Sequence, residues 1–108
     1  MKSKIRRVDA NYTGGGIYVY SGELENGTFF LFSDDWGAFE HVLFLDTDPD
    51  STEDSEFFEW QEEHKVGELS GSNAKTFAKT AIKKAIKALK NGESMNASQY
   101  ELEKRLAW

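Results

Sequence analysis

The chain has 108 residues, which fits one folded domain, and its 39% hydrophobic and 14% aromatic residues are enough for an apolar core. It has no cysteine, which excludes disulfides, thiolate metal sites and cysteine nucleophiles. No apolar run approaches the roughly 20 residues that span a bilayer, so the sequence predicts a single soluble, cytoplasmic domain over residues 1–108, without membrane contact.

The net charge of −6 conceals a strong segregation along the chain. Residues 1–32 carry four basic and three acidic side chains, for a charge of +1. Residues 33–70 carry thirteen acids against one lysine, for −12, and residues 71–108 carry eight bases against three acids, for +5. This pattern predicts a surface with separate acidic and basic regions.

Segments rich in aromatic and β-branched residues predict the strands of an antiparallel sheet. Turn signals separate the first four: the glycines at 14–16, the Asn26-Gly27 pair, and Gly37 behind an acidic segment. Because short turns join consecutive strands, we expect a meander. The predicted strands cover residues 4–10, 17–20, 28–32 and 39–45, and residues 66–69 are predicted as an edge strand.

Residues 52–64 fit two structures. Phe57, Trp60 and His64 lie at i, i+3 and i+7, which favours one face of a helix, whereas Trp60, Glu62 and His64 also alternate as in a strand. An acidic first turn behind a serine or threonine cap supports the helix, which we predict here.

The clearest predicted element is an amphipathic helix over residues 73–91, capped by Ser72 and ended by Gly92. A short helix over residues 97–108 follows, capped by Asn96 or Ser98. The expected fold class is α+β: a four- to five-stranded antiparallel meander packed by a long C-terminal amphipathic helix, with one or two short helices. The polar face of the long helix carries Lys75, Lys79, Lys83, Lys84, Lys87 and Lys90.

No residue pattern predicts a catalytic or cofactor site. The two histidines, His41 and His64, lie in no ligand-spaced motif, and a strand follows the glycine triplet where a phosphate-binding loop needs a helix. Both histidines are therefore interpreted as structural. We predict that the protein has no cofactor and is not an enzyme.

A calcium loop is the strongest metal hypothesis and also fails. Asp46, Asp48 and Asp50 alternate as at the start of an EF-hand loop. The sixth position, however, is Ser51 where glycine is required, and the twelfth is Phe57 where a bidentate glutamate belongs. A hydrated acidic loop leading into a helix explains the same residues, so no metal is predicted.

The central acidic segment is the candidate binding surface. Thirteen carboxylates within 38 residues repel one another, and their spacing resembles a phosphate backbone that would be attracted to a basic groove. Aromatic residues among them supply anchors for an interface. The alternative is local neutralisation by the lysine-rich helix packed nearby. The predicted partner-binding residues are Asp46, Asp48, Asp50, Glu53, Asp54, Glu56, Phe57, Glu59, Trp60, Glu62 and Glu63.

Three segments, 12–20 (YTGGGIYVY), 33–36 (SDDW) and 60–64 (WQEEH), resemble small proteins carried by phages and conjugative elements of Gram-positive bacteria. The resemblance implies an anti-CRISPR or DNA-mimicking inhibitor whose partner is a host protein with a basic nucleic-acid-binding groove, such as a CRISPR effector nuclease. The alternatives are a nucleic-acid-binding accessory that uses the lysine-rich helix, and a structural or assembly module.

Overall fold

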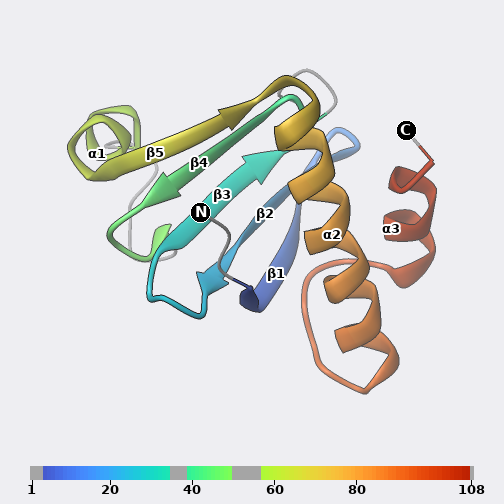
Figure 1. Ribbon diagram of the computed structural model, residues 1–108. Helices are drawn as coiled ribbons and strands as arrows, with labels where there is room; N and C mark the ends of the chain where they lie inside the picture. The colour runs from blue at the N-terminus through green and yellow to red at the C-terminus, as the bar shows by residue number, and fades with distance from the viewer. Residues whose placement is uncertain (1–3, 35–38, 50–56, 108) are drawn as a thin grey trace.

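The computed structural model describes residues 4–34, 39–49 and 57–107, with the side chains of residues 57–59 left out of the description. Five strands form one antiparallel sheet, and three helices lie around it (Figure 1). In chain order the elements are β1 (Ile5–Gly14), β2 (Ile17–Leu24), β3 (Phe29–Ser33), β4 (His41–Leu45), α1 (Phe57–His64), β5 (Lys65–Ser70), α2 (Gly71–Lys90) and α3 (Gln99–Arg105).

The predicted α+β class and antiparallel meander are confirmed, because the strand order in the sheet is β1-β2-β3-β4-β5. The β2–β3 turn contains Gly27 at φ 90°, a conformation that suits the Asn-Gly pair predicted there. β1 is longer than predicted and extends through Tyr12, which pairs with Tyr18 on β2. The turn between β1 and β2 is therefore short and is formed by the glycines at positions 14–16.

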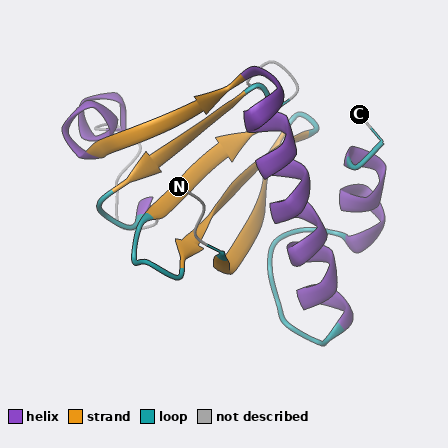
Figure 2. Ribbon diagram, viewed as in Figure 1, coloured by secondary structure: helices purple, strands orange, loops and turns teal. Residues whose placement is uncertain are grey.

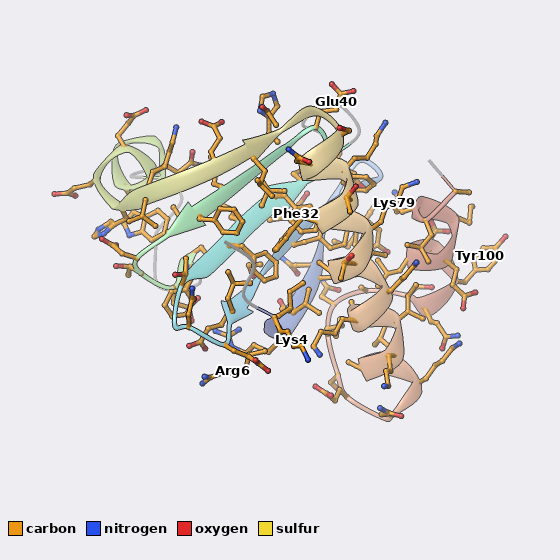
Figure 3. All side chains as sticks on the ribbon, in the orientation of Figure 1. Lys4, Arg6, Phe32, Glu40, Lys79 and Tyr100 are labelled. Atoms are coloured by element: carbon orange, nitrogen blue, oxygen red, sulfur yellow. The ribbon has the colours of Figure 1, made fainter. Side chains whose placement is uncertain are left out.

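One face of the sheet packs against α2 and forms the core. Cross-strand partners Tyr20 and Phe32 place their aromatic rings on this face, and both are fully buried. Phe77 of α2 meets the rings of Phe30, Phe32 and Phe44 edge-on at centroid distances of 5.1, 6.4 and 5.4 Å. Figure 3 shows Phe32 beneath the helix. The apolar residues of α2 recur at helical intervals and are buried against the sheet, as the sequence predicts.

The opposite face of the sheet is also buried in part. Leu31 is 3% exposed and Leu45 is fully buried, although both point away from α2. The chain leaving β4 turns toward this face, since Asp48 forms an ion pair with Arg7 on β1, at 3.1 Å. The first residues after β4 therefore have a structural role, because Asp48 connects this part of the chain to β1.

Residues 57–64 form helix α1, in agreement with the helical alternative, while residues 50–56 lie outside the described part of the chain. α1 runs directly into β5, and β5 runs directly into α2 (Figure 2). Gly71 adopts φ 62° at the β5–α2 junction, so the chain turns into the helix two residues earlier than predicted. The N-cap is Ser70, without a side-chain cap bond, and the prediction of Ser72 as the cap is wrong.

The prediction that the long helix is C-terminal is also wrong. Gly92, at φ 94°, ends α2 as expected, but the chain then returns along the sheet edge and forms α3. The returning loop pairs with the outer edge of β1: Tyr12 N–H donates to the Asn96 carbonyl at 2.8 Å, and Asn96 Nδ2 donates to Asn11. Ser98 caps α3, and Leu102 anchors it in the core.

Candidate functional site

The fold places the acidic helix α1 and the lysine-bearing helix α2 at opposite ends of β5. Six residues of extended chain separate them by about 20 Å. α2 then runs away from α1, across the sheet toward β1 (Figure 1). At physiological ionic strength the Debye length is about 8 Å, so the lysines of α2 do not neutralise the carboxylates of α1.

We call the described carboxylates around α1 the acidic pole, consisting of Asp46, Glu62 and Glu63. Glu62 and Glu63 are exposed, and neither has an ion-pair partner within 4.0 Å among the described residues. The aromatic residue Trp60 beside them is half-buried, and its ring packs against the ring of His64 at a centroid distance of 5.1 Å. The acidic pole therefore combines two exposed carboxylates without an ion pair among the described residues, those of Glu62 and Glu63, with the half-buried ring of Trp60.

Asp46 belongs to a small network at the base of α1. Its Oδ1 lies 2.7 Å from His64 Nδ1 and also accepts a hydrogen bond from Thr47 at 3.0 Å. The hydrogen bond with His64, followed by that from Thr47, lowers the pKa of Asp46. His64 lies in the last turn of α1. These contacts fasten the end of α1 to the end of β4.

Asp48 has a different partner from Asp46. Its carboxylate faces Arg7, which also approaches Glu23 at 3.6 Å, so that Arg7 links β1, β2 and the loop after β4. Asp46 and Asp48 thus hold two separate contacts. The third aspartate of the proposed calcium loop, Asp50, lies outside the described residues. Within the described residues, no group of three histidine or carboxylate side chains is placed to hold a metal ion.

The structure brings together part of the predicted partner-binding set. Trp60, Glu62 and Glu63 share α1, and Asp46 lies at its base. Asp48 is engaged elsewhere, at Arg7. The remaining six lie outside what the structure describes, four of them entirely and two by their side chains: Asp50, Glu53, Asp54, Glu56, Phe57 and Glu59.

The six predicted lysines of α2 divide into two groups. Lys83, Lys84, Lys87 and Lys90 are exposed, whereas Lys75 and Lys79 are half-buried. Figure 3 shows Lys79 on the side of α2 that faces α3. Across the described residues, none of the six lies within 4.0 Å of a carboxylate. The helix itself contains no acidic residue, so its charge of +6 is not offset internally.

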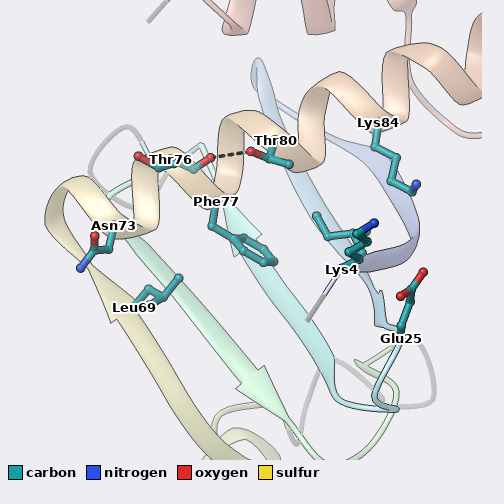
Figure 4. Close-up of a pocket in the computed structure, with 9 residues that line it drawn as sticks. Lys4, Glu25, Leu69, Asn73, Thr76, Phe77, Thr80 and Lys84 are labelled. Carbon is teal, nitrogen blue, oxygen red and sulfur yellow. Dashed lines mark hydrogen bonds between the residues drawn. The ribbon is translucent and has the colours of Figure 1, made fainter. Parts of the chain in front are cut away.

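Sequence reasoning missed a basic groove between α2 and the start of β1. Arg6 and Arg7 from β1 line this groove together with Lys84 and Lys87 from the C-terminal half of α2. A neighbouring cavity of about 440 Å³ lies between the sheet and the first half of α2, with Phe77 and Leu69 in its apolar lining. Lys4, Glu25 and Lys84 lie at one end of this cavity, and Leu69 and Asn73 lie at the other (Figure 4). Residues about 80 positions apart form these walls, so no local motif could reveal them.

A buried ionic cluster lies on the other side of the core. Arg105 of α3 contacts Asp34 at 3.0 Å, and their side chains are only 7% and 2% exposed. Arg105 also donates to the Gly16 carbonyl at 2.6 Å and to Glu101 at 3.1 Å, and Asp34 accepts the Tyr18 N–H at 3.0 Å. Burial alone would lower the pKa of Arg105, but the hydrogen bond and charge of Asp34 raise it.

This cluster also affects the neighbouring Tyr20. Burial raises the pKa of Tyr20 well above its usual value, the charge of Asp34 raises it further, and Arg105 partly opposes both. Perturbed ionisable groups often indicate catalysis. Here, however, the Asp34 and Arg105 side chains are almost fully buried and hydrogen-bonded to each other, which is the arrangement of a structural crosslink.

The comparisons with known proteins identify no relative. No family model, no curated protein and no solved structure matches this chain. In the described ranges, neither α2 nor the shorter helices combine the length and apolarity needed to cross a bilayer.

Proposed function

We propose that this protein acts without catalysis, as an inhibitor that places its acidic pole in the basic nucleic-acid-binding groove of another protein. The supporting observation is the separation of α1 from the lysines of α2, which leaves Glu62 and Glu63 exposed and unpaired among the described residues. A basic groove that normally binds phosphates attracts such a surface, and the partly exposed Trp60 supplies an aromatic contact. The partner class that fits is a CRISPR effector nuclease, in keeping with the resemblance to small mobile-element proteins.

The described contacts refine which acids carry the proposal. Asp46 and Asp48 are internally paired, so their contribution is to position α1 and its connection under the sheet. Glu62 and Glu63 extend from consecutive positions on α1 without an internal partner in the described structure. We therefore assign direct contact with the partner to these two glutamates.

Charge reversal of this pair tests the proposal. We expect the protein to inhibit target-DNA cleavage by at least one of a panel of guide-loaded CRISPR effector nucleases from Gram-positive bacteria. The E62K/E63K variant should require at least a tenfold higher protein concentration for equal inhibition. Like charges that face each other at an interface cost several kcal/mol, and about 1.4 kcal/mol corresponds to a tenfold change in affinity. The measurement is a fluorescence cleavage assay across protein concentrations.

The matched control is E40K/E93K, which changes net charge equally at two exposed glutamates far from α1. Figure 3 shows Glu40 near the start of α2. This control should inhibit as the natural chain does, and both variants should keep a native circular dichroism spectrum. The proposal is wrong if no nuclease of the panel is inhibited, or if E62K/E63K inhibits undiminished.

The Asp46–His64 contact gives a separate prediction about pH. Because the folded-state pKa of Asp46 is lowered, this contact stabilises the fold above the unfolded pKa of about 3.9 and is lost as pH falls through the lower folded value. Thermal unfolding between pH 3 and 7 should show D46N less stable than the natural chain near pH 6, with the difference shrinking as the pH falls below the unfolded pKa. In an H64Q background the D46N difference should be much smaller at every pH. An equal difference in both backgrounds would show that His64 is not the partner.

A further inference from the structure

The exposed basic residues of β1 and α2 form one continuous surface, which we call the basic strip. Lys84 lines the cavity with Lys4 and the adjoining groove with Arg6, so it joins the two segments. Lys87 lines that groove and also a second groove beside Lys83 and Lys90. All the members of the strip are exposed: Lys4, Arg6, Lys83, Lys84, Lys87 and Lys90.

The basic strip keeps its positive charge in a protein of net charge −6. Within the described structure none of its six members has a carboxylate within 4.0 Å, and the one hydrogen bond from Arg6 goes to a backbone carbonyl, that of Glu25. Three glutamates border the strip, Glu25, Glu93 and Glu103, which leaves a local charge of +3. In a chain with 19 acids, six neighbouring cations without an acid partner indicate a surface built for an external anion.

From this geometry we infer that the basic strip binds the phosphate backbone of double-stranded nucleic acid, independently of its sequence. Lys83, Lys87 and Lys90 follow one another at about 6 and 4.5 Å along the helix axis, so several cations can follow a row of phosphates. Among the described residues, no aromatic side chain lines the grooves around Lys87, so stacking on unpaired bases is not part of this inference. A duplex, with its denser phosphate charge, fits the strip better than a single strand.

An anionic membrane is the other polyanion to consider, and the packing of α2 disfavours it. A helix that lies on a membrane needs a free apolar face, whereas Ala78, Ile82 and Ala85 of α2 are fully buried in the core. The exposed large hydrophobic residues of the described chain, Tyr12, Val66 and Tyr100, are not part of the strip. The strip therefore offers charge without an apolar anchor.

Fluorescence anisotropy with a labelled 20-base-pair DNA duplex tests this inference without reference to the acidic pole. If the strip neutralises about four or five phosphates, the logarithm of the affinity should fall with the logarithm of salt concentration with a slope of about −4. Affinity should then fall by about 250-fold between 50 and 200 mM salt. A single strand of the same length should bind more weakly.

Two triple variants with the same net charge separate the strip from general electrostatics. R6A/K84A/K87A removes charges from the strip and should weaken duplex binding at least tenfold at 100 mM salt, with the slope reduced by about 3. K75A/K79A/K104A removes three charges outside the strip and should change the affinity less than threefold. The side chains removed from the strip are exposed, and circular dichroism checks that both variants fold.

Three outcomes would overturn the inference: no duplex binding at 50 mM salt, equal weakening by both triple variants, or binding to phosphatidylserine-containing vesicles but not to DNA. Failure of nuclease inhibition would leave this result untouched, because duplex binding is measured without a nuclease and with substitutions that lie outside the acidic pole.

Discussion

Replacement of Arg105 by methionine is expected to lower the free energy of unfolding by about 3–5 kcal/mol, the usual cost of leaving a buried charge without its partner. The R105M side chain keeps much of the volume but leaves the Asp34 carboxylate facing an apolar group. It also removes the bonds to the Gly16 carbonyl and to Glu101. For a domain of this size the total is about 5–15 kcal/mol, so the loss is severe. Urea unfolding followed by tryptophan fluorescence measures it.

The neighbouring Lys104 supplies the control. It pairs with Glu101 at 3.5 Å and is 53% exposed at the side chain, so K104M should cost less than about 1 kcal/mol. The double variant D34N/R105M should lose less free energy of unfolding than D34N and R105M lose together as single variants. In the double variant neither position carries a buried unpaired charge. If R105M cost no more than K104M, the buried cluster would not be the crosslink that we describe.

Replacement of Gly22 by alanine is expected to be the second most damaging change, at about 3 kcal/mol. A Cβ atom at this position of β2 would lie 2.2 Å from the backbone carbonyl oxygen of Arg7 and 2.7 Å from the ring of Phe30. Side-chain rotation relieves only the contact with the ring. Strand β1 would have to move away from β2, and its hydrogen bonds to β2 would lengthen.

Gly67 of β5 is the matched control for this substitution, since it also lies within a strand and on the α2 face of the sheet. Its nearest contacts for an added Cβ are with Phe44, at 3.8 Å, an ordinary van der Waals distance. G67A should therefore be neutral, or stabilising by about 0.5–1 kcal/mol because alanine loses less conformational freedom than glycine. Equal urea midpoints for G22A and G67A would contradict the close packing of β1 on β2.

The sequence predicts the strands and α2 well because their signals are local. Alternating aromatic residues and the apolar rhythm of α2 are set within ten to twenty residues, and the sheet needs only short turns to form a meander. The sequence predicts Ser72 as the cap of α2, two residues after the observed Ser70, because it does not show that Gly71 lets the chain turn directly after β5. A short helix after the long one is predicted and is present as α3, so the description of the long helix as C-terminal is wrong because α3 follows it and packs Leu102 into the core.

The candidate surfaces depend on contacts that no local pattern contains. Asp34 counts as one more acid of the central segment, yet it is buried against Arg105, 71 residues further along. Likewise, Asp48 forms an ion pair with Arg7 of β1. Arg6 and Lys84, which are far apart in the sequence, line the same groove. The charge pattern along the sequence predicts separate acidic and basic regions on the surface. The fold keeps the acidic helix α1 apart from the lysines of α2 because β5 lies between the two helices.

The contact between Arg105 and the β1–β2 hairpin also bears on the order of assembly. Every strand of the sheet pairs with its neighbour in sequence, so the meander and α2 can form from nearby contacts, which generally favours rapid folding. The hydrogen bonds from Arg105 to Asp34 and Gly16 join positions 71 and 89 residues apart. During synthesis on a ribosome, Asp34 therefore has no cationic partner until Arg105 has emerged, and we expect α3 to dock after the meander has formed.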